Sequence, residues 1–123
     1  MLRPADGIYA LQASLLKTLA SPRRLEIVHY LGEAGPTEVR KLAEHFGMTQ
    51  PAISQHLAAL RGVGIVEPVR DGREVRYQLA DPEIVAACGI MRQVLIRRIA
   101  RLGDLAASYE SQAESAAIAA ASR

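Results

Sequence analysis

The chain has 123 residues, which is the size of one small domain. Half of its residues are apolar and 23% are charged, so the composition excludes a disordered chain, and no apolar run is long enough to span a bilayer. The net charge is +2 and no segment is strongly basic, so nucleic-acid binding has to be argued from where residues lie rather than from total charge.

Capping residues divide the first half of the chain into helices. Apolar residues three and four apart predict a first helix over residues 6–20. Ser21 and Pro22 predict the start of a second helix, because serine accepts a bond from a free amide and proline has no amide to lose. This helix is predicted to end between Gly32 and Gly35. Its predicted inward side chains are Leu25, Val28 and Leu31.

The third and fourth helices are short and follow each other closely. Thr37 is predicted to cap a helix that stops near Gly47, and Thr49 is predicted to cap the next helix, which runs to Arg61. The inward face of this fourth helix consists of apolar residues four and three apart: Ile53, Leu57 and Leu60. Two short helices joined by a tight turn predict a helix-turn-helix.

Two strand-like runs flank Asp71 and Gly72, which is a strong signal for a hairpin with a two-residue loop. This register places Glu67 opposite Arg76 as a cross-strand ion pair. Pro68 predicts that its strand lies at an edge. The other face of the hairpin is predicted to carry Val66, Pro68, Val75, Tyr77 and Leu79.

Asp81 and Pro82 repeat the pattern of a cap followed by proline and predict a last long helix that runs past residue 105. Residues 1–107 are predicted to form one domain, and residues 108–123 an Ala- and Ser-rich tail that either prolongs the helix or frays. The predicted fold class is mainly α with a β-hairpin wing, which is a winged helix-turn-helix.

Apolar stripes on the first and last helices predict a homodimer formed through these two helices. A monomer would leave more apolar surface exposed than a soluble protein usually tolerates. The predicted interface residues are Leu11, Leu15, Ile84, Cys88, Met91, Leu95 and Leu102.

The outward side of the fourth helix has uncharged polar and small side chains, and no acid lies between Met48 and Val66. Glutamine pairs with adenine, and serine bonds to any base edge, whereas a carboxylate would be repelled by phosphates. The predicted DNA-contacting residues are Thr49, Gln50, Ser54, Gln55, His56, Arg61, Arg70, Arg73 and Arg76.

One of these residues, His56, and two arginines outside the list, Arg23 and Arg24, each have two interpretations. His56 either contacts DNA or is half-buried and bonded to the backbone, and we favour the buried role. Arg23 or Arg24 either touches phosphate or belongs to the capped start of the second helix, and we favour the capping role.

Three segments resemble the ArsR/SmtB family of winged-helix regulators. Residues 16–27, LKTLASPRRLEI, resemble its opening signature, and residues 49–57, TQPAISQHL, resemble its recognition helix. Residues 70–73, with Tyr77 and Leu79, are similar to its wing. The resemblance covers about residues 11–105. It implies a bacterial or archaeal homodimeric transcription factor, usually a repressor that a signal releases from an inverted-repeat operator on double-stranded DNA.

The chain departs from this family at the metal positions. Glu38 and Arg40 stand where one family site has a Cys-x-Cys pair. The second family site, an Asp, two His and a Glu on the last helix, is matched by Asp81, Glu83, Val94 and Arg97. Zinc and similar metals require thiolates or imidazoles, so we expect no metal, no cofactor and a non-metal signal.

The remaining expectations concern chemistry and place. One cysteine excludes a disulfide framework, and Cys88 is either a redox sensor or a small buried apolar residue, which we favour. No catalytic motif is found, so we expect no enzyme. With no signal peptide visible, we expect a cytoplasmic protein with no membrane partner. The competing function is a winged-helix protein-interaction module that does not bind DNA, and the acid-free helix favours DNA.

Overall fold

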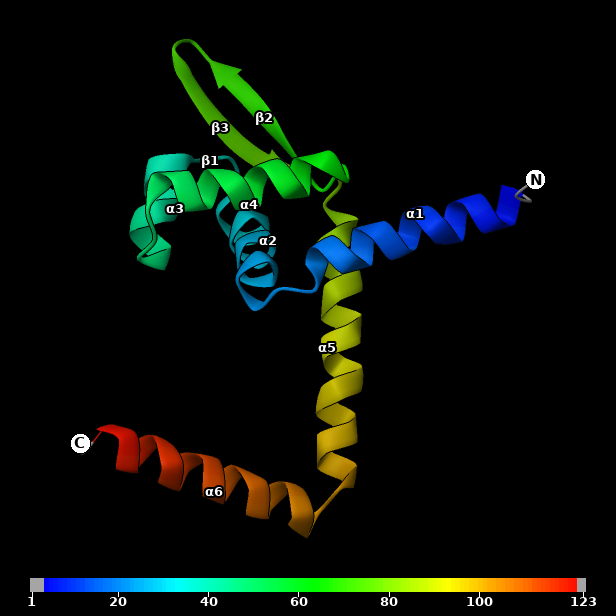
Figure 1. Cartoon of the computed structure of the whole chain (residues 1–123), viewed down its shortest axis with the longest axis vertical. Coiled ribbons are helices and arrows are strands. Elements are labelled where there is room, and N and C mark those ends of the chain that lie inside the picture. The colour runs from blue at the N-terminus through cyan, green and yellow to red at the C-terminus, as the bar shows by residue number, and fades with distance from the viewer. Residues whose placement is uncertain (1–3, 122–123) are drawn as a thin grey trace. The chain divides into compact units, whose positions relative to one another are not determined.

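The structure is a computed structural model that describes residues 4–121, with the side chains of residues 7–103, 111, 112 and 114–121 (Figure 1). In chain order the elements are α1 (Pro4–Leu19), α2 (Pro22–Ala34), β1 (Thr37–Glu38), α3 (Val39–Phe46), α4 (Gln50–Gly62), β2 (Val66–Asp71), β3 (Glu74–Leu79), α5 (Glu83–Arg101) and α6 (Asp104–Ala121). The chain divides after Val85 into two compact units. No helix among the described residues is long and apolar enough to cross a membrane.

The core of the first unit is built from apolar side chains of the helices and of the start of β2. Its buried members are Leu19, Ile27, Val28, Leu31, Leu42, Ala43, Ile53, Leu57, Leu60, Ile65 and Val66. The predicted inward face of α4 is confirmed. The prediction for α2 is wrong at Leu25, which is 40% exposed. The buried stripe of α2 consists of Ile27, Val28 and Leu31, and Leu25 lies about 110° from its centre around the helix.

Side-chain caps begin three of the helices where the sequence places them. The hydroxyl of Ser21 accepts from the backbone N of Arg24 at 3.4 Å, and that of Thr49 accepts from the backbone N of Ala52 at 3.2 Å. The carboxylate of Asp81 accepts from the backbone N two residues later at 3.0 Å. Each cap satisfies an amide that the first turn of a helix leaves without a partner, and the three predicted helix starts are confirmed.

Thr37 is not a helix cap. It lies in β1, where its backbone pairs with Tyr77 of β3, and its hydroxyl donates to the carbonyl of Gly35 at 2.8 Å. The N-cap of α3 is Glu38, whose side chain makes no capping bond. Thr37 is buried and β-branched, which suits a strand, and a strand of two residues is too short to show a period in the sequence.

The hairpin loop is Gly72 and Arg73, not Asp71 and Gly72. Asp71 instead pairs with Glu74 in the ladder. Gly72 has a φ of 65°, and no other residue of the hairpin has a positive φ, which is the pattern of a loop with glycine at its first position. A loop of Asp71 and Gly72 would need a positive φ at both residues, whereas a loop of Gly72 and Arg73 needs it at the glycine alone, so the loop begins one residue later than predicted.

The new register keeps each strand's faces but changes the partners. The side-chain amide of Gln78 donates to the carboxylate of Glu67 at 2.8 Å, so the predicted pair of Glu67 with Arg76 is wrong. Because the partner shifts by two residues, the predicted apolar face of the hairpin is preserved. The sheet order is β1-β3-β2, so the prediction that Pro68 lies on an edge strand is confirmed.

The second unit contains two helices rather than one long helix. α5 ends at Arg101, and Gly103 has a φ of 53° before α6 begins at Asp104. The left-handed glycine ends the helix earlier than predicted. The boundary predicted between residues 107 and 108 falls within α6 and stays a prediction, and residues 122 and 123 of the predicted tail lie outside the described residues.

Candidate nucleic-acid interface

The orientation of α4 within the first unit follows from its apolar face. Ile53, Leu57 and Leu60 are fully buried, and their spacing of four and three residues fixes which side of the helix is turned outward. The outward side carries Gln50, Ser54 and Gln55, all exposed, together with the cap Thr49.

The exposed side chains of α4 can bond to base edges. Gln50 and Ser54 are four residues apart and therefore lie on the same side of the helix, with Gln55 beside them. Glutamine can donate and accept at once, which matches the edge of adenine in the major groove. The structure thus brings the uncharged predicted contact residues together on one helix side.

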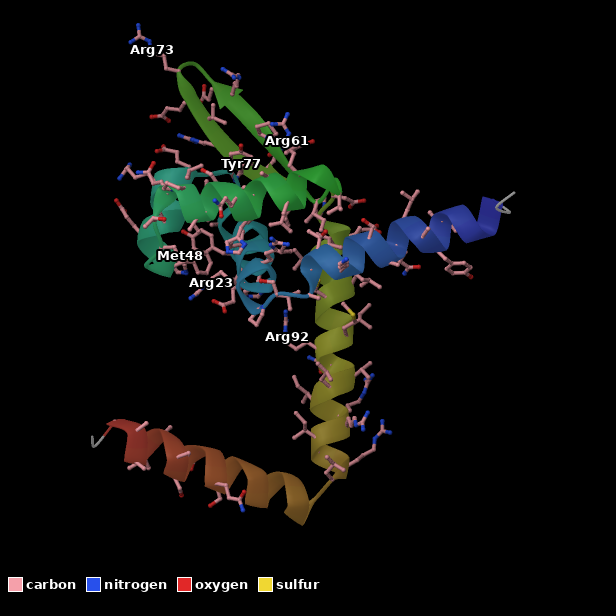
Figure 2. All side chains as sticks on the ribbon, viewed as in Figure 1. Arg23, Met48, Arg61, Arg73, Tyr77 and Arg92 are labelled. Atoms are coloured by element: carbon pink, nitrogen blue, oxygen red, sulfur yellow. The ribbon has the colours of Figure 1, made fainter. Side chains whose placement is uncertain are left out.

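Three of the predicted arginines are exposed at the end of α4 and on the hairpin. Arg61 lies in the last turn of α4, and Arg70 and Arg73 belong to the hairpin. Figure 2 shows Arg73 at the tip of the hairpin, where its side chain points away from the helices. Guanidinium groups at these places are suited to phosphate oxygens.

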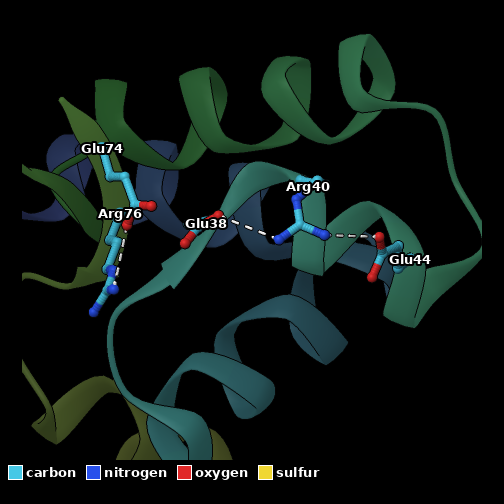
Figure 3. Close-up of polar contacts among 5 residues, drawn as sticks. All are labelled: Glu38, Arg40, Glu44, Glu74 and Arg76. Carbon is cyan, nitrogen blue, oxygen red and sulfur yellow. Dashed lines mark hydrogen bonds and ion pairs between the residues drawn. The ribbon is translucent and has the colours of Figure 1, made fainter.

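Arg76 is in a different environment from the other three. It is half-buried, its guanidinium lies 3.3 Å from the carboxylate of Glu74, and its backbone pairs with Glu38 (Figure 3). Part of its charge is therefore balanced within the sheet. Its predicted contact with DNA stays a prediction, with Glu74 as the competing partner.

His56 is half-buried, and its bonding partner differs from the predicted one. Its Nδ1 accepts from Nε of Arg24 at 3.1 Å, so the partner is a side chain of α2 and not the backbone. Burial, followed by the positive charges of Arg24 and Arg23, lowers the pKa of His56 below its ordinary value. Because Nε of Arg24 can only donate, this bond requires an Nδ1 without a proton, and the neutral ring then carries its proton on Nε2.

Sequence reasoning missed the role of Arg24. The pattern of a cap followed by proline accounted for residues 21–24 completely, so nothing in that segment indicated a bond to a residue 32 positions away. The only available signal was a histidine on the helix side between the apolar and the exposed faces, which needs a polar partner.

The two positions that match the Cys-x-Cys site form a network of ion pairs. Arg40 lies 3.7 Å from the carboxylate of Glu38 and 3.1 Å from that of Glu44 (Figure 3). A guanidinium therefore stands at one of the two family ligand positions, and a fixed positive charge there opposes the binding of a cation. Within the described part of the chain, no group of three or more His, Cys, Asp or Glu residues is arranged to hold a metal ion.

Comparisons with known proteins agree with this geometry. The family model described as "Bacterial regulatory protein, arsR family" matches residues 21–68. The uncharacterized HTH-type transcriptional regulator Rv0081 of Mycobacterium tuberculosis is 36% identical over 107 residues, which cover 84% of this chain and 94% of the relative.

Solved structures show the same fold. The crystal structure of M. tuberculosis Rv0081 matches with a TM-score of 0.70 and 34% identity, over 81% of this chain and 97% of that one. The solution structure of the homodimeric winged helix-turn-helix DNA-binding domain Mb0332 of Mycobacterium bovis matches with a TM-score of 0.67 and 31% identity, over 79% and 88%. The chain belongs to the arsR family of bacterial regulatory proteins and is a DNA-binding transcriptional regulator with a winged helix-turn-helix fold.

Proposed function

We propose that this chain is a homodimeric repressor that binds an inverted-repeat operator with α4 in the major groove and the hairpin β2–β3 on the backbone. The observation that carries this proposal is the exposed, acid-free side of α4 with arginines at its end and on the hairpin. A helix of this kind reads base edges, and the arginines bind phosphates without regard to sequence.

The DNA contacts divide into two classes. Gln50, Ser54 and Gln55 read base edges, because they are exposed, uncharged and close together on one side of α4. The second class positions the protein on the DNA backbone and comprises Thr49, Arg61, Arg70 and Arg73. Arg76 is a further member, although its charge is partly balanced by its ion pair with Glu74.

The dimer rests on apolar side chains that the single chain leaves exposed. Leu11 of α1 is 69% exposed, and Leu95 of α5 is 59% exposed. Further large apolar side chains of both helices are also exposed, and a surface of this kind marks an interaction site. We propose that a second copy covers them, with Leu15, Ile84, Met91 and Leu102 in the same interface and Cys88, which is buried, beside them. Two-fold symmetry then requires two operator half-sites in inverted orientation.

We also propose that the releasing signal is not a metal and that the protein acts in the cytoplasm, where its DNA is. The ion pairs of Arg40 with Glu38 and Glu44 support the first statement. For Cys88 we favour the structural role of a small buried apolar residue over that of a redox sensor, because only 9% of it is exposed.

A salt titration tests the proposed function. The protein is titrated onto a random duplex and onto a duplex selected by the protein from a random pool, at several salt concentrations. We expect affinity for both to fall steeply with salt, because binding releases counterions, and the selected duplex to bind at least ~10³-fold more tightly. A protein-interaction module would show neither the salt slope nor the preference, and either absence contradicts the proposal.

A further inference from the structure

Arg24 bonds to three different elements of the first unit. Its backbone N donates to the cap Ser21 at the start of α2. Its side-chain Nη1 donates to the carbonyl of Thr18 in α1 at 3.2 Å, and its Nε donates to Nδ1 of His56 in α4 at 3.1 Å. The guanidinium is therefore held at two points of its planar fork, and its orientation is fixed.

The bond to Thr18 supplies one of the partners that the end of α1 needs. The last four carbonyls of a helix have no partner within it. The carbonyls of Lys17 and Leu19 accept from the backbone N atoms of Ala20 and Ser21, and that of Thr18 accepts from Arg24. A cation is also favourable at this end of a helix, because the helix dipole is negative there. Arg24 is thus a fixed part of the end of α1.

The bond to His56 acts on the orientation of α4. The buried contacts of Ile53 and Leu57 draw α4 onto the core, but apolar contacts have little directional preference. A hydrogen bond does have one, and this bond involves the residue that directly follows Ser54 and Gln55. A small rotation of α4 about its axis would break the bond and would move both exposed side chains.

We propose that Arg24 is a positioning residue for DNA binding, which holds α4 at one rotation relative to the end of α1 through His56 and Thr18. The inference rests on the proposed function, in which α4 reads the bases. Because α1 is one of the proposed dimer helices, the same two bonds set how the recognition helices of the two subunits are oriented relative to the dimer. Arg24 then determines sequence preference without touching DNA.

The first test compares two substitutions of His56. His56→Asn keeps an acceptor near the position of Nδ1, whereas His56→Leu removes it. We measure the ratio of affinities for the selected and the random duplex at pH 7.5. His56→Leu is expected to lower this ratio about tenfold, as the loss of one part-buried hydrogen bond implies, and His56→Asn to keep it within about threefold. Circular dichroism checks that both variants are folded. Equal losses in both variants would overturn the proposal, because the acceptor would not matter.

The second test uses the two neighbouring arginines. Arg24→Lys keeps the charge but replaces a fork by a single ammonium that cannot reach both partners. Arg24→Lys is expected to lower the ratio of selected-duplex to random-duplex affinity about tenfold, while the affinity for the random duplex changes little. The double variant Arg24→Lys, His56→Leu should lower this ratio no further, because both substitutions break the same bond. Arg23→Lys is the matched control, because Arg23 contacts Glu26 and the Phe46 ring instead, and it should leave the ratio unchanged.

The outcomes separate the two proposals. A wild-type protein without salt-dependent, selective binding contradicts the proposed function, and this is seen before any variant is made. If the wild type is selective and both His56→Leu and Arg24→Lys leave the affinity ratio unchanged, only the role of Arg24 is overturned.

Nitrogen NMR shifts of His56 give a readout without DNA, since the proposal requires an unprotonated Nδ1 and a protonated Nε2.

Discussion

At the scale of single residues, DNA recognition depends on which atoms are free to bond outward. Gln55 is exposed on α4, and Arg73 is exposed at the hairpin tip. In the proposed function they belong to different classes of contact. An amide that reads one base edge contributes to selectivity, and a guanidinium on a phosphate contributes to affinity for every sequence.

Substitution of these two residues should separate the classes. Gln55→Ala is expected to reduce discrimination at one base pair by ~1–3 kcal/mol, and Arg73→Ala to weaken all duplexes alike and to lower the salt slope by about one unit. Fluorescence anisotropy with selected and random duplexes measures both effects. If Gln55→Ala leaves the ratio of the two affinities unchanged, Gln55 does not read a base.

The lowered pKa of His56 predicts how stability depends on pH. Its folded-state pKa lies below the unfolded value of about 6.5, so the unfolded chain binds more protons in this range. The stabilising contribution is complete above pH 7.5 and is lost as pH falls through 6.5 toward the folded value. His56→Asn should have a flatter free energy of unfolding between pH 7.5 and 5.5, measured by urea unfolding. The other two histidines are present in both proteins, so identical slopes would contradict the assigned environment.

At the scale of elements, a glycine allows α2 to approach the first turn of α5, which belongs to the first unit. A Cβ atom on Gly32 would lie 2.7 Å from a methyl group of Val85 and 3.6 Å from one of Leu79. The first distance is too short for a real contact. Valine is branched at Cβ and has few other rotamers, so the methyl group cannot easily move away.

Gly32→Ala should therefore destabilise the protein although alanine favours helices. We expect a loss of ~1–3 kcal/mol from overpacking, partly offset by the ~1 kcal/mol preference of helices for alanine. Thermal unfolding measures the net effect as a lower Tm. Gly62→Ala is the control, because nothing lies within 4 Å of its added Cβ. A Tm for Gly32→Ala at or above that of wild type would show that Val85 moves freely.

Elements with strong local signals were predictable from the sequence, and those defined by distant partners were not. A cap bonds to an amide no more than three residues away, so the sequence alone indicates the helix starts at Ser21, Thr49 and Asp81. Thr37 belongs to β1 only because Tyr77 lies opposite it. Asp71 and Gly72 both favour turns, so the sequence did not show which of them begins the loop, and the backbone angle of Gly72 decides it. The bond between Arg24 and His56 spans 32 residues and has no local signature.

At the scale of the whole molecule, the exposed apolar side chains of α1 and α5 predict a dimer in solution. Light scattering at micromolar concentration should give twice the monomer mass. Leu95→Glu should produce monomers, because a carboxylate in an apolar interface has no partner. Arg97→Glu, an exposed polar position on the same helix, should leave the dimer intact. A monomeric wild type would contradict the proposed interface.

Metal ions should not release the protein from DNA. Zinc, nickel, cadmium and arsenite bind thiolate or imidazole ligands, and Arg40 instead pairs with Glu38 and Glu44 at one family position. Anisotropy of the bound duplex should stay unchanged as each metal is added, and calorimetry should show no stoichiometric uptake of zinc. Sub-micromolar zinc binding coupled to release would contradict the non-metal signal.

The three-stranded sheet also bears on how the molecules behave when they are crowded. Sheets with open edges tend to add strands from neighbouring molecules and to grow into aggregates. Here one edge strand, β2, contains Pro68, which lacks an amide hydrogen, and the strand on the other side, β1, has only two residues. Within the described residues the sheet therefore offers a neighbour little backbone to pair with. We therefore expect that a concentrated solution of the protein does not aggregate through the edges of this sheet.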